Sequence, residues 1–198
     1  MHARWLEAES EIRKTWEIAD FSGATTLALR SYGPEVLGFL IALDKDHDAA
    51  EQAFSHFAER LWRGMQRFEW KCSVRTWSYV LARHAAADVR RGEAKHRRHR
   101  VPFSDDPISE VAARVRTATI SLLRTDSRTA FARLRDELPE DARALLVLRV
   151  DRELEWREIA RVFGAEESTI DRETARLRKR FQLVKERLKT LGKARGLI

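Results

Sequence analysis

The chain has 198 residues, of which 43% are hydrophobic and 35% are charged, and its formal net charge is +7. The hydrophobic content suffices for a packed core and excludes global disorder, and the length fits one domain or two small ones. The positive charge favours a polyanionic partner. Because only four prolines and eight glycines interrupt the periodic segments, we predict an all-α protein.

Simple counts disfavour several other classes of protein. Cys72 is the only cysteine, so no internal disulfide forms, which fits a reducing compartment. The N-terminus has no apolar core of a signal peptide, and no run of about eighteen apolar residues predicts a transmembrane helix. The sequence has no phosphate-binding glycine loop and no cofactor motif. His84, His96 and His99 lack the cysteine or acidic partners of a metal site, so we assign them to a basic surface.

The first half of the chain predicts a series of amphipathic helices. Apolar residues recur at steps of three and four, and the expected helices are Met1–Ala19, Thr25–Leu43, one from about Asp48 to Met65, and one that begins near Val74. Gly33 and Pro34 should kink or divide the second of these helices. Asp48 and Glu51 have the spacing of a capping box at the start of the third.

Two basic features adjoin the fourth helix. The segment Arg67–Ser73 (RFEWKCS) precedes it and is short, aromatic and basic. The tract Arg83–Arg100 contains seven Lys or Arg residues and two acids. Charge of one sign at this density repels itself unless an anion offsets it, so the tract predicts phosphate contacts. A solvated helix end is the alternative.

A change of composition then separates the two halves. Val101–Asp126 begins with a cluster of proline, serine and aspartate residues, and we interpret it as a linker with a helix over Ile108–Leu123. A second helical unit begins at Ser127. In that unit Pro139 suits the first turn of a helix, and the acidic residues after it are favourable at the positive end of the helix.

The segment Glu155–Phe181 predicts a helix-turn-helix. Its first helix has one apolar face, and Gly164 permits the backbone angle that ends a helix. Ser168 or Thr169 can cap the following helix, which is rich in arginine. A short helix, a glycine turn and a polar helix form a typical reader of the major groove. A helical hairpin with a solvated charged face is the alternative, and the basic charge of the whole chain favours DNA binding.

The motifs of the second half resemble those of the bacterial RNA polymerase sigma factors of the extracytoplasmic-function (ECF) type. Residues similar to the family's "LP…R…LR" helix are Leu138, Pro139, Arg143, Leu148 and Arg149. Residues similar to its "EIA…G…GTV" and "RAR" motifs are Glu158, Ile159, Ala160, Gly164, Ser168, Thr169, Ile170, Arg176 and Arg178. Ser168 stands in place of the usual glycine, Leu177 in place of the alanine, and Asp171 where a basic residue is frequent.

The first half resembles the same family in part. Residues similar to its "WL..IARN.A.D..R" helix are Trp77, Ala82, Arg83, Ala86, Asp88 and Arg91. His84 stands where the family has asparagine. The segment Asp48–Glu51 is similar to the acidic "DAED" segment, with Phe54 at the following glutamine position. The resemblance covers Thr25–Arg91 and Arg128–Leu188.

This resemblance implies a two-domain initiation factor without enzymatic activity. The implied organisation is a region 2-like domain at residues 20–100, a linker at 101–126 and a region 4-like domain at 127–192. The implied partners are the RNA polymerase core, through its β′ clamp helices and β flap, and promoter DNA, with an anti-sigma factor as a possible regulator. The implied location is the cytoplasm, in association with the nucleoid.

The resemblance also assigns candidate residues to three surfaces. Those expected at the upstream −35 element, on the recognition helix, are Ser168, Thr169, Arg172, Glu173, Arg176, Lys179 and Arg180. Those expected at the −10 element, where a base is unstacked and held by aromatic and cationic side chains, are Trp70, Lys71, Arg83, His84, Arg90 and Arg91. Those expected at the polymerase are Asp48, Glu51 and Phe54. Phe68 and Trp77 are expected in the core.

Two other functions remain open at this point. The first is a helix-turn-helix regulator that binds DNA without the polymerase core. The second is an interaction protein whose helices mainly hold a partner. The acidic start of the segment Asp48–Phe57 favours the initiation factor, because a plain regulator does not need it.

Overall fold

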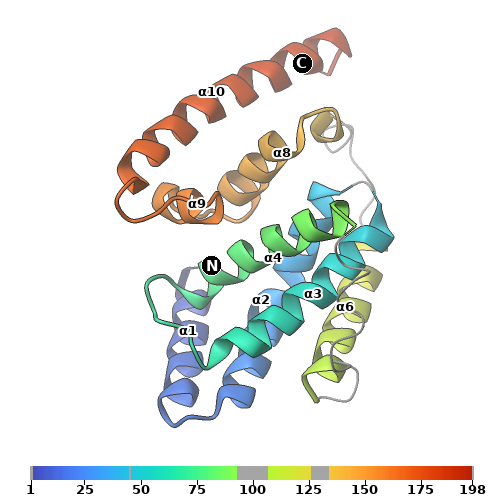
Figure 1. Cartoon of the computed structure of the whole chain (residues 1–198). Coiled ribbons are helices and arrows are strands. Elements are labelled where there is room, and N and C mark those ends of the chain that lie inside the picture. Colours follow the sequence, from blue (N-terminus) through green and yellow to red (C-terminus); the bar gives the residue numbers. More distant parts are fainter. Residues whose placement is uncertain (1, 45, 93–106, 126–133, 198) are drawn as a thin grey trace.

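The computed structural model describes residues 2–44, 46–92, 107–125 and 134–197 (Figure 1). All regular structure in these ranges is helical, which confirms the all-α prediction. The helices in chain order are α1 (His2–Glu17), α2 (Phe21–Leu43), α3 (His47–Met65), α4 (Val74–Arg90), α6 (Pro107–Thr125), α8 (Glu140–Leu146), the π-helical turn η2 (Val147–Asp151), α9 (Trp156–Val162) and α10 (Ile170–Ala194). No helix in the described ranges is long and apolar enough to cross a membrane.

Helix α2 lies at the centre of the N-terminal bundle and packs against α1, α3, α4 and α6 (Figure 1). It is buried on several sides, because Ala28 and Leu37 lie on opposite sides of the helix and both are fully buried. The expected division at Gly33 and Pro34 was wrong, because α2 continues through both residues. Pro34 lies on the exposed side, while the buried residues before and after it hold the helix together.

Helices α3 and α4 pack closely against each other. A Cβ atom on Gly64 would lie 2.8 Å from the ring of Trp77, so the absence of a side chain there permits the contact. The expected capping box at Asp48 was wrong by two residues: Asp46 caps α3, and its carboxylate accepts from the Asp48 amide at 2.9 Å. Ser73 caps α4 through the amide of Thr76.

The helix expected inside the linker is α6, and it packs on α2 and α3. Ile108 and Ala112 are buried there. A Cβ atom on Gly33 would lie 2.8 Å from the side chain of Val115, so α6 approaches α2 closely. The rest of the basic tract (93–100), the start of the linker (101–106) and the start of the second unit (127–133) lie outside the described residues.

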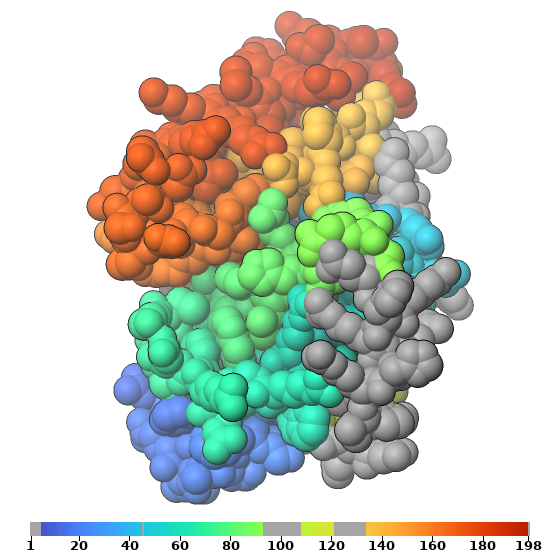
Figure 2. Space-filling model, in the orientation of Figure 1, coloured from blue at the N-terminus to red at the C-terminus, as the bar shows by residue number. Residues whose placement is uncertain are grey.

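The C-terminal unit consists of α8, η2, α9 and α10, and it lies against α2 and α4 (Figure 1). Helix α10 buries Ile170, Leu177, Phe181 and Val184 on one face. Its Phe181 ring meets Trp156 edge to face at 5.5 Å. The buried residues of both units form one continuous cluster. Figure 2 shows the C-terminal unit in direct contact with the region that contains α4.

Candidate nucleic-acid interface

Helices α9 and α10 form the predicted helix-turn-helix. Glu155 and Glu158 form a reciprocal capping box at the start of α9. Gly164 follows α9 with a φ of 88°, a value that favours glycine, and thereby confirms its role as the helix stop. Thr169 occupies the N-cap position of α10, but the expected side-chain cap was wrong. Its hydroxyl donates instead to the carbonyl oxygen of Glu166 at 3.1 Å.

The first turns of α10 present cations around one carboxylate. Arg172 and Arg176 have side chains that are 77% and 79% exposed. The carboxylate of Glu173 lies 3.6 Å from each guanidinium. Both arginines are therefore exposed at the surface, where they can reach a nucleic acid. The side chains of Ser168 and Lys179 are exposed nearby.

A groove runs between the turn and α10. It has a volume of about 810 Å³, and its lining includes Phe163, Thr169, Glu173, Arg176, Lys179 and Leu183. The lining is therefore mixed: beside apolar side chains it has three cations (Arg176, Lys179 and Arg180) and two carboxylates (Glu166 and Glu173). Asp171, which departs from the family pattern, is exposed and lies 3.5 Å from Arg157. A carboxylate is favourable there because the N-terminus of a helix is positive.

Arg180 lies apart from the other recognition-helix cations. Its guanidinium is 3.2 Å from Asp141 in the first turn of α8. Arg83 of α4 contacts the other oxygen of the same carboxylate at 2.7 Å, and Arg90 pairs with Glu140 at 2.8 Å. Asp141 of α8 thereby connects α4 and α10, the two helices on which we expected DNA contacts from the sequence.

The other candidates on α4 lie on its polar side. Arg91 pairs with the buried carboxylate of Asp88 at 2.6 Å, and Arg60 of α3 pairs with the same carboxylate. Desolvation lowers the pKa of His84, and the nearby charges of Arg60 and Arg83 lower it further. His84 is therefore a neutral hydrogen-bonding group rather than a cation at neutral pH.

The aromatic-basic loop packs partly into the bundle. Phe68 is buried and stacks on Trp77 with ring centroids 4.5 Å apart. Trp70 is half-buried, with a φ of 57°, and its ring meets Trp16 of α1 edge to face at 5.8 Å. Its indole nitrogen is buried without a hydrogen-bond partner among the described residues. By contrast, Lys71 is exposed.

Trp70 and Lys71 each have a charged neighbour. The guanidinium of Arg13 lies 5.2 Å above the Trp70 ring, within the range of a cation–π contact. Glu69 pairs with Lys71 at 2.5 Å and raises the pKa of the lysine. Sequence reasoning missed the contribution of α1, because no local spacing connects it with a loop some fifty residues later along the chain.

The candidate polymerase-binding residues divide into surface and core. Asp48 is exposed. Glu51 is 35% exposed and lies 3.7 Å from Arg116 of α6. Phe54 is 1% exposed and packs against Phe57, with ring centroids 5.6 Å apart. The expectation that Phe54 contacts the polymerase does not fit this burial, because its apolar ring lies on the inner face of α3.

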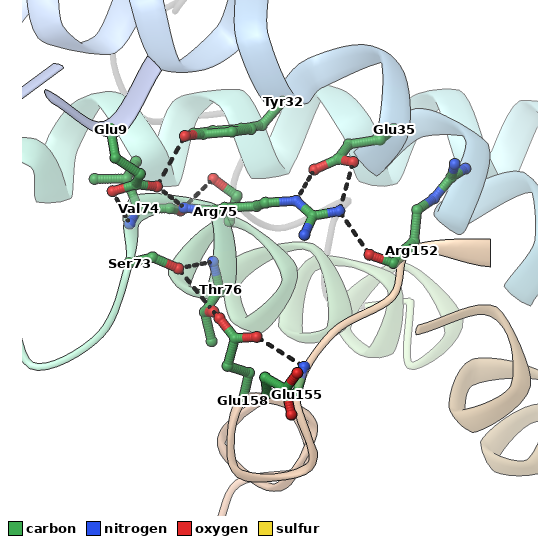
Figure 3. Close-up of polar contacts among 11 residues, drawn as sticks. Glu9, Tyr32, Glu35, Ser73, Val74, Arg75, Thr76, Arg152, Glu155 and Glu158 are labelled. Atoms are coloured by element: carbon green, nitrogen blue, oxygen red, sulfur yellow. Dashed lines mark hydrogen bonds and ion pairs between the residues drawn. The ribbon is translucent and has the colours of Figure 1, made fainter. Parts of the chain in front are cut away.

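A polar cluster at the start of α4 connects the two units (Figure 3). Arg75 forms a bidentate pair with Glu35 at 2.7 and 3.0 Å and donates to the Arg152 carbonyl at 2.9 Å. Glu9 of α1 accepts from the amides of Val74 and Arg75, which caps α4 from outside. The sequence indicated none of these partners.

Two comparisons with protein-family models match the chain. Sigma-70 region 2 matches residues 28–96, and Sigma-70 region 4 matches residues 128–181. The region 4 match is of the form typical of ECF sigma factors. Comparisons with curated proteins and with solved structures gave no match.

The two matched regions together span more than half of the chain, and both come from the same family. The all-α fold and the helix-turn-helix agree with them. The chain therefore belongs to the sigma-70 family and is a sigma factor with regions 2 and 4, which directs RNA polymerase to promoters.

Proposed function

We propose that, in this sigma factor, residues 127–192 read the −35 element and residues 20–100 hold the −10 element. The observation that carries the proposal is the pair of exposed arginines, Arg172 and Arg176, on the first turns of α10. Arginine pairs with the acceptor atoms of guanine, and Glu173 between them can accept from cytosine. Ser168 and Thr169 lie at the start of the same helix, where base contacts are made.

Two cations farther along the recognition helix are proposed to contact phosphates. Lys179 is exposed and Arg180 is half-buried. Because a cation attracts phosphate whatever the base sequence, these residues position the domain on DNA rather than specify the site.

At the −10 element, Trp70 and Lys71 are proposed to hold an unstacked base. Trp70 has a backbone conformation that costs energy for a non-glycine residue, and such strain is frequent at functional sites. Its indole N–H is buried and lacks a partner among the described residues, so pairing with a base edge requires the side chain to turn outward. Arg83, His84, Arg90 and Arg91 lie along the adjacent polar side of α4, where a single strand could run.

Contact with the polymerase is proposed at the acidic start of α3. Asp48 and Glu51 offer carboxylates to the β′ clamp helices, and Phe54 supports this surface from the core. The β flap is the proposed partner of the C-terminal unit, since the groove beside α10 combines apolar and charged side chains. An anti-sigma factor is a further possible partner for the same exposed surfaces. Promoter binding would bring the protein to the nucleoid.

Reconstituted transcription tests the proposed function. Core polymerase and the purified chain are mixed with a panel of genomic fragments, and transcripts are mapped. The expected result is initiation at a subset of fragments, only when both proteins are present. DNA binding without any association with the core, at any salt concentration, would refute the polymerase assignment and favour a regulator that acts alone.

A further inference from the structure

Helix α6 lies beside the part of α3 that the proposed function gives to the polymerase (Figure 1). The guanidinium of Arg116 is 3.7 Å from the carboxylate of Glu51, and it donates a hydrogen bond of 3.3 Å to the Ser55 hydroxyl. Because Glu51 and Ser55 are one turn apart on α3, a single side chain of α6 engages both. Helix α6 therefore supplies a cation to the acidic surface proposed for polymerase binding.

The contact of α6 with the bundle extends to Phe54, which was also expected at the polymerase. A Cβ atom on Gly33 of α2 would lie 2.8 Å from the side chain of Val115 and 3.5 Å from the end of the Phe54 ring. Both side chains therefore meet at the same point of α2. In the free chain, Glu51 and Phe54 thus adjoin α6, while Asp48 is exposed.

The described face of α6 that lies on the bundle is narrow and consists of small side chains. Ile108, Ala112 and Thr119 are buried, and together with Val115 they form one stripe at helical spacing. Because hydrophobic stabilisation grows with the apolar area removed from water, this stripe holds α6 less firmly than one of leucine and phenylalanine would. The ion pair that joins α6 to α3 is partly exposed on both sides, so it contributes little. The contact can therefore be exchanged for another.

We propose that α6 occupies the polymerase-binding surface of the free chain and gives way to a helix of the polymerase core when the two proteins associate. This inference rests on the proposed function, because it takes the acidic start of α3 as the docking surface. The incoming helix meets the same chemistry as α6, so it presents a cation to Glu51 and small apolar side chains beside Phe54. Because α6 belongs to the same chain, its contact with α3 is intramolecular and is not weakened by dilution.

The expected effect depends on the fraction of molecules in which α6 has left α3. If only these molecules bind the polymerase core, the apparent dissociation constant equals the intrinsic one divided by this fraction. When α6 covers the surface in about nine tenths of the molecules, core binding is about tenfold weaker than for a fully uncovered surface. Loosening α6 should therefore strengthen core binding, and fixing α6 in place should abolish it.

The first test compares two substitutions of equal charge in α6 of the full chain. Arg116→Ala removes the contacts with Glu51 and Ser55. Arg114→Ala is the control, because it removes the same charge from an exposed pair with Glu110 in the same helix. Affinity for core polymerase is read by anisotropy of a chain labelled with fluorescein at its N-terminus. We expect Arg116→Ala to bind the core several-fold more tightly than Arg114→Ala, and equal or weaker binding overturns the inference.

The second test fixes α6 in place with a reversible covalent bond. A Cβ atom on Gly33 would lie 3.8 Å from the Cβ atom of Val115, a separation that suits a disulfide. The chain for this test carries Gly33→Cys and Val115→Cys, with Cys72→Ser to remove the native thiol, and mass spectrometry verifies the cross-link. The oxidised chain should lose core binding and the reduced chain should regain it, whereas the same reductant should leave binding of the unmodified chain unchanged. Equal core binding by the oxidised and reduced forms overturns the inference and makes α6 a fixed part of the surface.

A single substitution replaces this chain if it does not unfold cooperatively. Gly33→Ala adds a Cβ atom 2.8 Å from Val115, and because a β-branched side chain has few alternative rotamers, α6 must move away from α2. We expect tighter core binding than that of the unmodified chain, without any change of charge. Unchanged or weaker binding counts against the inference.

The same measurements separate this inference from the proposed function. Failure of the unmodified chain to bind core polymerase and to direct it to any promoter would remove the proposed function. Failure of the inference alone would leave promoter-dependent transcription intact, with the oxidised and reduced cysteine chains equally active. Promoter-dependent transcription that is lost on oxidation and restored on reduction supports both.

Discussion

The hydroxyl of Thr76 donates a hydrogen bond of 2.7 Å to the carboxylate of Glu158, which joins the first turn of α4 to the first turn of α9 (Figure 3). The other oxygen of Glu158 accepts from the backbone amide of Glu155 at 2.8 Å. One side chain therefore caps the first helix of the helix-turn-helix and ties it to the N-terminal bundle. The local cap and the contact between the two units depend on the same carboxylate.

Thr76→Val should lower the free energy of unfolding by about 1–3 kcal/mol, because Thr76 is fully buried and Glu158 loses its donor. Urea unfolding measures the change. Thr190→Val is the matched control, since the Thr190 hydroxyl bonds only within its own helix and is exposed. Equal stability of the two variants would contradict a role for the Thr76 bond in joining the units.

Replacing Arg75 by methionine should cost about 3–5 kcal/mol, because it leaves the buried carboxylate of Glu35 without its cation. The double variant Arg75→Met with Glu35→Gln should recover part of this loss, which a double-mutant cycle in urea detects. Arg114→Ala provides the surface comparison. Its pair with Glu110 is more than half exposed on both sides, so a change of about 0.5 kcal/mol or less is expected. Strict additivity in the cycle would mean that Arg75 and Glu35 do not interact.

Arg176→Ala should weaken binding of the upstream promoter element by about 1–3 kcal/mol, the usual contribution of one good contact to a base. Binding to core polymerase and the melting temperature should not change, because the side chain is 79% exposed. Arg187→Ala is the control, as it removes the same charge from an exposed position farther along α10. Fragments that carry the mapped promoter, compared by gel shift with the holoenzyme, supply the measurement. A parallel loss with Arg187→Ala would indicate a general effect of charge.

Cys72 should react slowly with iodoacetamide near neutral pH. Burial raises the pKa of its thiol above the ordinary value of 9.0, and Arg161 only partly offsets this. The reactive thiolate therefore forms at higher pH than in an unfolded chain. Because the folded chain holds the proton more tightly, stability should fall as the pH rises through the pKa of the unfolded thiol. Mass spectrometry of the alkylation rate of Cys72 against pH, with the urea-unfolded chain as reference, measures this difference in reactivity. Equal rates for the folded and unfolded chains at neutral pH would contradict it.

Regular periodicity made several elements predictable. Apolar residues at steps of three and four predicted α3 and the start of α4 within a few residues, and Gly164 marked the turn of the helix-turn-helix through its need for a positive φ. Pro34 does not divide α2, because a local rule on proline does not include the neighbouring helices that pack on α2. The burial of Phe54 likewise depends on the direction in which the inner face of α3 points.

The amino-acid sequence by itself determined that this is an all-α sigma factor with an arginine-rich recognition helix, because helical spacing, caps and motifs are properties of neighbouring residues. Only the tertiary structure decided that Asp141 bridges Arg83 and Arg180, and that Glu158 reaches Thr76. These partners lie 39 to 82 residues apart along the chain. Such a contact depends on how whole helices pack, and no local pattern in the sequence records it.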